Sequence, residues 1–244
     1  MDKKHIVITG ACGALGVEIT KHFLKKNFNV STIDLIPFDS VNNPELHNHY
    51  ECDLTSEKNV KNTFSKICNS EGVPDVLLNL AGWIYNQPII SMSNGEFITH
   101  GAESWEKSFK TNVDTAFYCS KSCISSLLGV RKKGVIVNFS SVSAAGNAGQ
   151  IAYSSSKSAL CGMSNTIGKE VGPFGIRCVS LSLGFIEVES TKNSLSDQKL
   201  KEIINKTPLK KLGSVGNVVS AIEFIIENDF LNATSIDLDG GLVL

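Results

Sequence analysis

Short apolar runs alternate with longer segments of helical periodicity along this chain, and this alternation restricts its fold more than any other feature. Such alternation is typical of βαβ units, in which crossover helices join parallel strands. Val76-Leu77-Leu78 and the run 135–137 are apolar throughout, as expected for strands covered on both faces. The expected strands are 5–9, 29–34, 75–79, 134–140, 176–182 and 235–238, and the expected helices are 14–27, 56–70, 104–129 and 152–171. We therefore predict an α/β fold with a doubly wound, Rossmann-like, mostly parallel sheet and helices on both faces, a three-layer α/β/α arrangement.

The size and charge of the chain limit its organisation and its partners. Its 244 residues contain no Pro-, Ser- or Gly-rich linker, so we expect a single domain over residues 1–244. A formal net charge of -1 gives no basic surface of the kind that binds nucleic acid. No apolar run reaches the roughly 18 residues that span a bilayer. We expect a small-molecule substrate as the partner, with no nucleic acid and no membrane.

The cysteines and histidines give no sign of a metal site. The seven cysteines are an odd number without a CxxC pair, which is typical of reduced thiols in a cytoplasmic protein. Cys119 and Cys123 share a helix face but have no histidine nearby in the sequence. His47 and His49 would lie on one side of a strand, again without further ligands. We therefore predict a cytoplasmic protein that holds no metal.

A glycine-rich turn from Thr9 to Gly16 follows the first expected strand and opens the first expected helix. In this context glycines allow a tight turn and let backbone amides approach a pyrophosphate at the helix N-terminus. The candidate cofactor-binding residues of the turn are Gly10, Cys12, Gly13, Ala14, Leu15 and Gly16.

Asp34 ends the second expected strand, 18 positions beyond Gly16 (34 minus 16). This separation is close to the roughly 20 residues expected for a carboxylate that binds a ribose diol. The charge of Asp34 would repel the 2′-phosphate of NADP, and the glycine turn contains no Lys or Arg to favour it. We therefore predict NAD(H) as the cofactor. The alternative is an ordinary strand-end Asp that caps a turn.

Tyr153 and Lys157 are four residues apart, a spacing that places both side chains on one face of a helix. A phenol with an ordinary pKa of about 10 is a poor acid–base catalyst near neutral pH. An adjacent ammonium stabilises the phenolate and lowers that pKa toward the working range. The two residues are therefore a candidate proton-transfer pair, although solvated helix faces show the same spacing by chance.

Several weaker motifs occur in a defined order, and with them the chain resembles the short-chain dehydrogenase/reductase family nearly end to end. The motifs are the glycine turn, Asp53-Leu54, Asn79-Leu80-Ala81-Gly82, Asn112, Ser140-Ser141, Tyr153 with Lys157, Leu183-Gly184-Phe185-Ile186 and Asp239-Gly240-Gly241. Each motif is weak alone, but the ordered set is strong.

The resemblance implies further cofactor contacts. Asp53 and Leu54 would contact the adenine, and Ile186 would meet the nicotinamide. The cofactor-binding residues that the resemblance adds to the glycine turn and Asp34 are Asp53, Leu54, Asn79, Ala81, Gly82, Tyr153, Lys157 and Ile186.

The resemblance also implies a catalytic set of Asn112, Ser141, Tyr153 and Lys157. Tyr153 would donate a proton to the substrate oxygen that Ser141 orients. Lys157 would bind the nicotinamide ribose, and Asn112 would hold a water that passes protons to Lys157. A homodimer or homotetramer, with the helices around Asn112 and Tyr153 between subunits, follows from the same resemblance.

Two features of the sequence depart from the family pattern or leave a choice open. The family usually has Gly where this chain has Ala14, and the spacing here resembles that of the longer, sugar-nucleotide-modifying branch. The short C-terminal end argues against that branch. Ser140 and Ser141 precede Tyr153 by 13 and 12 positions (153 minus 140, 153 minus 141), and strand alternation lets only one face the substrate. We favour Ser141, because the loop 142–149 can lose a residue at little cost.

A long loop follows Gly82 at the carboxyl end of an expected strand, where open α/β sheets bind ligands. We expect it to form a wall of the substrate pocket, with a subunit contact or a surface excursion as the alternative. Its candidate residues are Trp83, Tyr85, Gln87, Phe97 and His100. A second segment, 187–207, resembles a lid that closes over the substrate.

We interpret the chain as an NAD(H)-dependent oxidoreductase that interconverts a secondary alcohol and a ketone. A polyol or sugar derivative fits the polar composition of the segment 187–207. The first alternative is a 3-oxoacyl-(acyl-carrier-protein) reductase; such family members usually take NADPH, and Asp34 argues against that. A non-catalytic NAD-binding scaffold or sensor is the alternative from another class, and the intact Ser, Tyr, Lys and Asn set argues against it.

Overall fold

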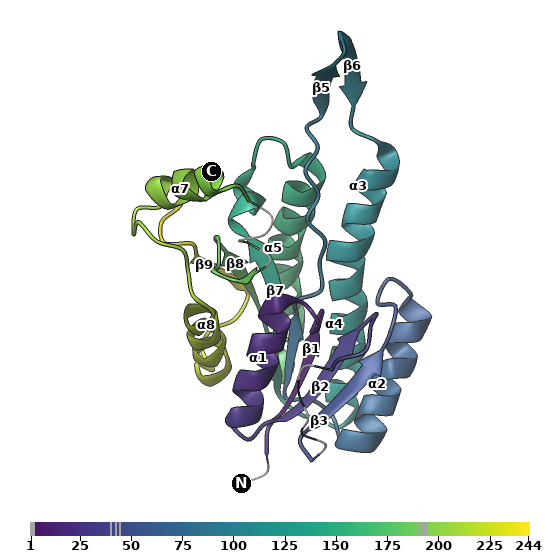
Figure 1. Ribbon diagram of the computed structural model, residues 1–244. Coiled ribbons are helices and arrows are strands. Elements are labelled where there is room, and N and C mark those ends of the chain that lie inside the picture. The colour runs from purple at the N-terminus through teal and green to yellow at the C-terminus, as the bar shows by residue number, and fades with distance from the viewer. Residues whose placement is uncertain (1–2, 40, 42, 44, 190, 192–194) are drawn as a thin grey trace.

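The computed structural model describes residues 3–39, 41, 43, 45–189, 191 and 195–244. Its main sheet has seven strands, all parallel, in the order β3-β2-β1-β4-β7-β8-β9 (Figure 1). The strands are β1 (His5–Thr9), β2 (Asn29–Asp34), β3 (His47–Glu51), β4 (Val76–Asn79), β7 (Gly134–Ser141), β8 (Ile176–Leu183) and β9 (Thr234–Leu238). The predicted doubly wound α/β fold is confirmed.

Helices cover both faces of this sheet, because each strand in its centre is apolar on both sides. On one face, α1 (Ala14–Lys25) and α8 (Val215–Glu227) bury their apolar sides in one core cluster. On the other, α2 (Glu57–Glu71), α4 (Thr115–Gly129) and α5 (Ile151–Val171) pack on a second cluster. A further helix, α7 (Asp197–Lys206), lies beside the carboxyl ends of β8 and β9 (Figure 1). None of the described helices could cross a membrane, because none is both long and apolar enough.

The strand order reverses between β1 and β4, and this reversal locates the functional edge of the sheet. The chain proceeds outward from β1 to β2 and β3, then returns to β4 on the other side of β1. In open α/β sheets, ligands bind in the crevice outside the carboxyl ends of the strands at such a point. The glycine turn follows β1 and the segment from Ala81 follows β4, so both lie at this crevice.

The helix predicted over 104–129 is interrupted. The structure has α3 (Ala102–Phe109), then a π-turn η1 (Lys110–Asp114), then α4. Turns of this kind occur mostly as single insertions within helices, frequently at functional sites. Asn112 lies in the middle of this π-turn and is fully buried.

Residues 90–99 form a separate two-stranded antiparallel sheet, β5 (Ile90–Ser93) and β6 (Glu96–Thr99). Asn94 and Gly95 connect the strands with positive φ at both positions, 52° and 83°, which is typical of the tight hairpin turn that Asn-Gly favours. Figure 1 shows this hairpin projecting beyond the rest of the molecule. It was not among the strands expected from the sequence.

Candidate active site

The glycine turn packs directly on the end of β4, and only glycine fits at two of its positions. Gly10 has φ +65°, and a Cβ atom there would lie 2.6 Å from the Cα atom of Ala81. A Cβ atom on Gly16 would lie 2.6 Å from the carbonyl oxygen of Gly10. Gly13 caps α1 without a side-chain hydrogen bond, so the N–H groups of the first helical turn keep their capacity to bind an anion. Ala14 and Leu15 begin that turn.

The Asp34 carboxylate lies beside this turn and is held by two backbone amides. Oδ2 accepts a hydrogen bond from Cys12 N at 2.9 Å, and Oδ1 accepts one from Leu35 N at 2.7 Å. Burial and the nearby Asp34 raise the pKa of the Cys12 thiol to about 11. The thiol, which also hydrogen bonds to Asp34, is therefore protonated near neutral pH. An ionised carboxylate has about four lone-pair sites, so Asp34 keeps acceptor capacity for a hydroxyl donor.

An open hollow of about 370 Å³ lies between the ends of β2 and β3 and the start of α2, and one of the two expected adenine residues borders it. Asp53 lines this hollow together with Leu35 and Lys66. Asp53 Oδ1 accepts hydrogen bonds from N and Oγ1 of Thr55 at 2.9 and 2.7 Å, and these bonds lower the pKa of the carboxyl. Leu54, the other expected adenine residue, is buried in the second core cluster and does not line the hollow.

Asn79 is placed differently from the other expected cofactor residues. Its Nδ2 donates to Asn138 Oδ1 at 2.8 Å, Ser120 Oγ at 3.0 Å and Ala116 O at 3.3 Å, so the side chain points into the protein and joins β4 to β7 and α4. Its Oδ1 has no hydrogen-bond partner among the described residues. Contact between Asn79 and a bound cofactor would therefore have to use its main chain.

Thr9, which we did not predict, organises the segment after β4. Its Oγ1 accepts hydrogen bonds from Leu80 N at 3.1 Å and Ala81 N at 3.2 Å. The last residue of β1 thereby fixes the loop that carries Ala81 and Gly82. Ile186, at the opposite wall, is buried and pairs with Gly213 through an isolated bridge.

Lys157 and Asn112 meet beneath Gly82. A Cβ atom added to Gly82 would lie 2.9 Å from Asn112 Oδ1 and 3.4 Å from Lys157 Nζ. The Lys157 ammonium is buried and donates to the carbonyl oxygen of Phe139 at 2.7 Å. Burial lowers the pKa of Lys157 to about 8. Two of its three N–H donors have no hydrogen-bond partner in the described part of the chain, so they can serve a ligand.

The Asn112 side chain is fully buried and fixed on every side. Its Oδ1 accepts from Trp83 N at 2.7 Å, and Nδ2 donates to Trp83 O at 3.1 Å. The same nitrogen lies 3.2 Å from Ser108 Oγ and 3.0 Å from Ser156 Oγ. Asn112 therefore joins the π-turn, the loop after β4 and α5. Ser108 and Ser156 were not predicted, since no local pattern distinguishes them from other helical serines.

Tyr153 lies on the same face of α5 as Lys157 and is buried. Burial raises the pKa of its phenol, and a hydrogen bond with the Ser141 side chain offsets part of that effect. Lys157 Nζ is 5.8 Å from the centre of the Tyr153 ring. The lowered phenol pKa that we predicted for the pair is therefore wrong for the chain alone, because desolvation outweighs the influence of an ammonium directed at Phe139.

The two serines at the end of β7 have different environments. Ser140 is buried, and its hydroxyl donates to the main-chain oxygen of Lys157 at 2.9 Å. Ser141 is half-buried, accepts from Ser143 N at 3.1 Å and is the serine whose side chain hydrogen bonds to Tyr153. Strand alternation thus directs one hydroxyl into α5 and the other toward the phenol.

The loop after β4 divides into two parts. Near its start, Trp83 stacks on Tyr85 with ring centres 4.8 Å apart, and His100 packs edge-on against Tyr85. Phe97 lies far along the projecting hairpin and is 77% exposed, so it does not belong to this aromatic cluster. The expected pocket wall is thus limited to the two ends of the loop, which carry Trp83, Tyr85 and His100, and residues 90–99 are an excursion. Part of the expected lid, 187–207, lies outside the described residues.

Comparison with known proteins agrees with this geometry. The family described as short chain dehydrogenase matches residues 4–199. The 3-oxoacyl-(acyl-carrier-protein) reductase FabG of Buchnera aphidicola subsp. Schizaphis graminum is 30% identical over 100% of this chain and 99% of its own length. A solved 4-hydroxyisoleucine dehydrogenase complexed with NADH is 27% identical with a TM-score of 0.84, and ElxO with NADP bound is 25% identical with a TM-score of 0.88; each alignment covers 98% of both chains. Both of these structures contain a nicotinamide cofactor, NADH in one and NADP in the other.

Proposed function

Because the chain belongs to the short-chain dehydrogenase family, whose members are oxidoreductases with nicotinamide cofactors, we propose that it interconverts a secondary alcohol and a ketone with NAD(H). One observation carries this proposal. The buried ammonium of Lys157, the side chain of Asn112 and the Tyr153–Ser141 pair converge at the carboxyl edge of the sheet, beside the glycine turn. A protein that only bound a dinucleotide would not need a phenol and an ammonium at this position.

The residues of the chain account for the proton transfer in such a reaction. The cofactor, when bound, supplies or accepts the hydride. In ketone reduction, negative charge develops on the carbonyl oxygen, so Tyr153 donates its proton there while Ser141 orients the oxygen by a hydrogen bond. The phenolate that remains is stabilised by the Lys157 ammonium, which the carbonyl oxygen of Phe139 holds in place. In alcohol oxidation Tyr153 takes the proton instead.

The preference for NAD(H) over NADP(H) rests on Asp34. Two backbone amides hold its carboxylate beside the glycine turn, where a ribose diol would donate to it. A 2′-phosphate at the same place would meet a negative charge instead. Replacing Asp34 by Ala is expected to weaken NADH binding and to improve the use of NADPH. Equal use of both cofactors by the wild-type enzyme would contradict the proposal.

For the substrate, we propose a polar compound such as a polyol or sugar derivative. Amide and hydroxyl groups gather next to Tyr153: Gln150 Oε1 accepts from Ser143 Oγ and Asn147 Nδ2 at 2.9 Å each, and Gln150 Nε2 donates to Asn86 Oδ1 at 2.6 Å. Groups of this kind can exchange their mutual hydrogen bonds for bonds to substrate hydroxyls. The relatives named FabG favour a second candidate, a 3-oxoacyl thioester.

A panel of substrates tests the proposal and separates its two candidates. NADH fluorescence is followed with polyols, keto-sugars and a 3-oxoacyl thioester, and turnover of only the thioester would overturn the polar substrate. Tyr153→Phe is expected to abolish turnover while cofactor binding remains. Tyr118→Phe is the matched control, because Tyr118 belongs to α4 and packs against the second core cluster, which contains none of the proposed catalytic residues. Full turnover by Tyr153→Phe would refute the assignment of Tyr153.

A further inference from the structure

The carbonyl oxygen of Ile36 is the point at which three separate segments meet beside the glycine turn. It accepts a hydrogen bond from His49 Nε2 in β3 at 2.9 Å, and the Cys12 thiol of the glycine turn lies 3.5 Å from it. The same thiol lies 3.6 Å from the carbonyl oxygen of Pro37. A thiol is a weak donor with a single proton, so the bond from His49 is the stronger contact. Residues 35–38, which we name the β2 loop, are thus held between the glycine turn and β3.

The β2 loop continues directly from Asp34, which ends β2. Leu35 N donates to Asp34 Oδ1 at 2.7 Å, and the Leu35 side chain lines the hollow at the ends of β2 and β3. Leu35 and Ile36 are 66% and 57% exposed, so little apolar packing holds this part of the loop. The hydrogen bond at the Ile36 carbonyl therefore contributes to where Leu35 and the Asp34 carboxylate lie.

The hydrogen bonds around His49 form a chain whose direction follows from counting protons. A carbonyl oxygen only accepts, so His49 Nε2 carries a proton, and in the neutral ring Nδ1 is then an acceptor. This Nδ1 lies 3.0 Å from Thr32 Oγ1 and receives the single hydroxyl proton. The Thr32 oxygen lies 2.8 Å from His47 Nε2 and accepts a hydrogen bond from it. The chain of donors thus proceeds from His47 through Thr32 and His49 to Ile36.

This chain is anchored in the interior of the protein. Thr32 is fully buried, and it is the partner of His49 in the register of β2 and β3. Phe38, the last residue of the β2 loop, is buried, with its ring centre 5.0 Å from that of His47 and 5.9 Å from that of His49. Burial and the neighbouring His49 lower the pKa of His47, so its ring is neutral near pH 7. Both imidazoles are therefore held by the Thr32 hydroxyl and by the Phe38 ring.

We propose that His49 is a positioning residue for the cofactor, which through the carbonyl oxygen of Ile36 holds the β2 loop and the Asp34 carboxylate in the arrangement that binds the adenosine half of a dinucleotide. This inference rests on the proposed use of NAD(H). A histidine that served only the stability of β3 would change the free energy of unfolding. A positioning residue changes the dissociation constant of the cofactor in the folded chain, and the two roles can therefore be separated.

The direction of the chain of hydrogen bonds is tested on the unmodified protein without cofactor. The histidines are labelled with ¹⁵N, and long-range ¹H–¹⁵N correlation spectra identify which nitrogen of each ring carries the proton. We expect the Nε2–H form for both His47 and His49, with the signals assigned from His47→Gln and His49→Gln. A His49 ring in the Nδ1–H form would leave the Ile36 carbonyl without this donor and would overturn the proposal.

Titration of NADH fluorescence without substrate measures the effect on binding. His49→Asn lacks an N–H group near the Nε2 position, so we expect it to raise the dissociation constant of NADH roughly threefold to tenfold, the value of about one hydrogen bond. The dissociation constant of ADP-ribose, measured by competition, should rise by the same factor, because the β2 loop adjoins the adenosine half. His49→Gln is the matched control, since its amide nitrogen reaches the Nε2 position and should restore binding. With saturating NADH, kcat should equal the wild-type value in both variants.

The outcomes distinguish this inference from the proposed function. Wild-type affinity in His49→Asn, equal losses in the two variants, or a loss confined to kcat would overturn the positioning role. A wild type that binds NADPH as tightly as NADH would instead overturn the proposed cofactor, and the effect of His49→Asn on ADP-ribose would still report on the loop. Thermal unfolding verifies that each variant is folded at the assay temperature, and the spectra of the wild type are decisive if one is not.

Discussion

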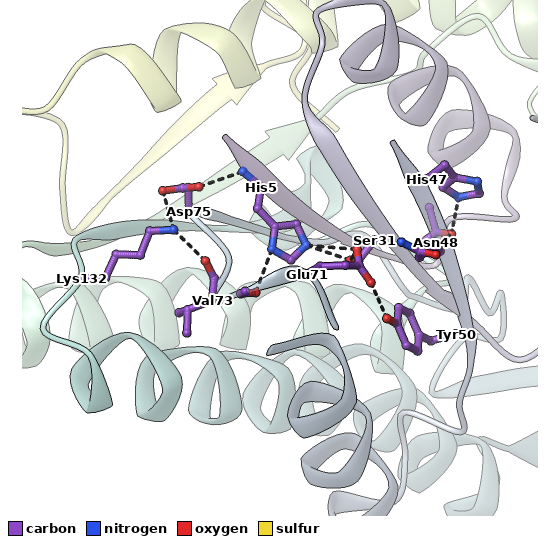
Figure 2. A network of polar contacts seen from close by, with 11 residues as sticks. His5, Ser31, His47, Asn48, Tyr50, Glu71, Val73, Asp75 and Lys132 are labelled. Carbon is purple, nitrogen blue, oxygen red and sulfur yellow. Dashed lines mark hydrogen bonds and ion pairs between the residues drawn. The ribbon is translucent and has the colours of Figure 1, made fainter. Parts of the chain in front are cut away.

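At the amino edge of the sheet, several polar side chains bond to one another, whereas at the carboxyl edge the charged groups of Lys157 and Asp34 bond to the main chain. Figure 2 shows the amino edge, where His5 Nε2 lies 2.8 Å from Ser31 Oγ, and both Ser31 and Tyr50 donate to the Glu71 carboxylate. At the carboxyl edge, Lys157 donates to a backbone carbonyl and Asp34 accepts from backbone amides. The side chains of the amino edge satisfy one another's hydrogen bonds. Lys157 and Asp34, by contrast, keep a donor and an acceptor for a ligand.

The amino-edge network extends along the start of β1 and β4 (Figure 2). His5 N donates to Asp75 Oδ2 at 2.8 Å, and Asp75 Oδ1 forms an ion pair with Lys132 Nζ at 2.9 Å. Burial lowers the pKa of His5, and burial together with Glu71 raises the pKa of Tyr50 to about 12. Both groups are therefore neutral near pH 7. Strongly shifted pKa values occur at both edges, so a shifted pKa alone does not identify a catalytic site in this molecule.

The two serines of β7 provide the largest expected contrast. Ser141→Ala should reduce kcat by about 10²-fold or more, because it removes the hydrogen bond that orients the substrate oxygen. Ser140→Ala should leave kcat within a few-fold, since the Ser140 hydroxyl bonds to the main chain of Lys157 and to the thiol of Cys161, both on α5. Steady-state kinetics on the substrate found in the panel measures both. The reverse order of effects would assign the catalytic role to Ser140.

A substitution at the amino edge should lower the free energy of unfolding and leave kcat unchanged. Glu71→Ala leaves Ser31 and Tyr50 without their acceptor, so we expect a loss of about 2–3 kcal/mol in the free energy of unfolding. The kcat at a temperature well below unfolding should stay unchanged. Glu57→Ala is the control, because its ion pair with Lys121 is exposed and should contribute less than about 1 kcal/mol. Urea unfolding measures the change, and a kcat that fell with Glu71→Ala would contradict the contrast.

The smallest expected effect concerns pH. Lys157 has a pKa of about 8 in the folded chain, below the roughly 10.4 of an exposed lysine. Between these values the unfolded chain binds more protons, so folding stability should rise with pH there. Urea unfolding without cofactor, from about pH 7 to about pH 10, should show this rise in the wild type relative to Lys157→Met. Identical pH dependence in the two chains would mean that the ammonium does not lose its charge in that range.

Local patterns made much of the carboxyl edge predictable. The spacing of Gly10 and Gly16, and the position of Asp34 at a strand end, depend on geometry within one βαβ unit. The hairpin of β5 and β6 could also have been predicted, since Asn94-Gly95 between alternating apolar residues is a strong local signal of a hairpin turn. We instead interpreted residues 90–99 as part of the wall of the substrate pocket, because this segment follows β4 at the ligand-binding edge of the sheet.

The remaining features depend on contacts between distant parts of the chain. The pKa of Tyr153 depends on how deeply α5 is buried, and spacing along a helix does not reveal that depth. His5 and Glu71 are 66 positions apart (71 minus 5), so no motif joins them. His47 and His49 do share one side of β3, as predicted, where both rings contact the hydroxyl of Thr32.

The strand order also determines when the site can form during synthesis. Ile6 in β1 pairs with Val30 in β2 and with Val76 in β4, so the first strand to leave the ribosome waits for its second neighbour until 70 positions later (76 minus 6). Lys157 arrives later still and bonds to the end of β7. Chains fold from the N-terminus as they emerge, so the dinucleotide half can assemble before the catalytic helix has been made. The nascent protein would then acquire its ability to bind before its ability to react.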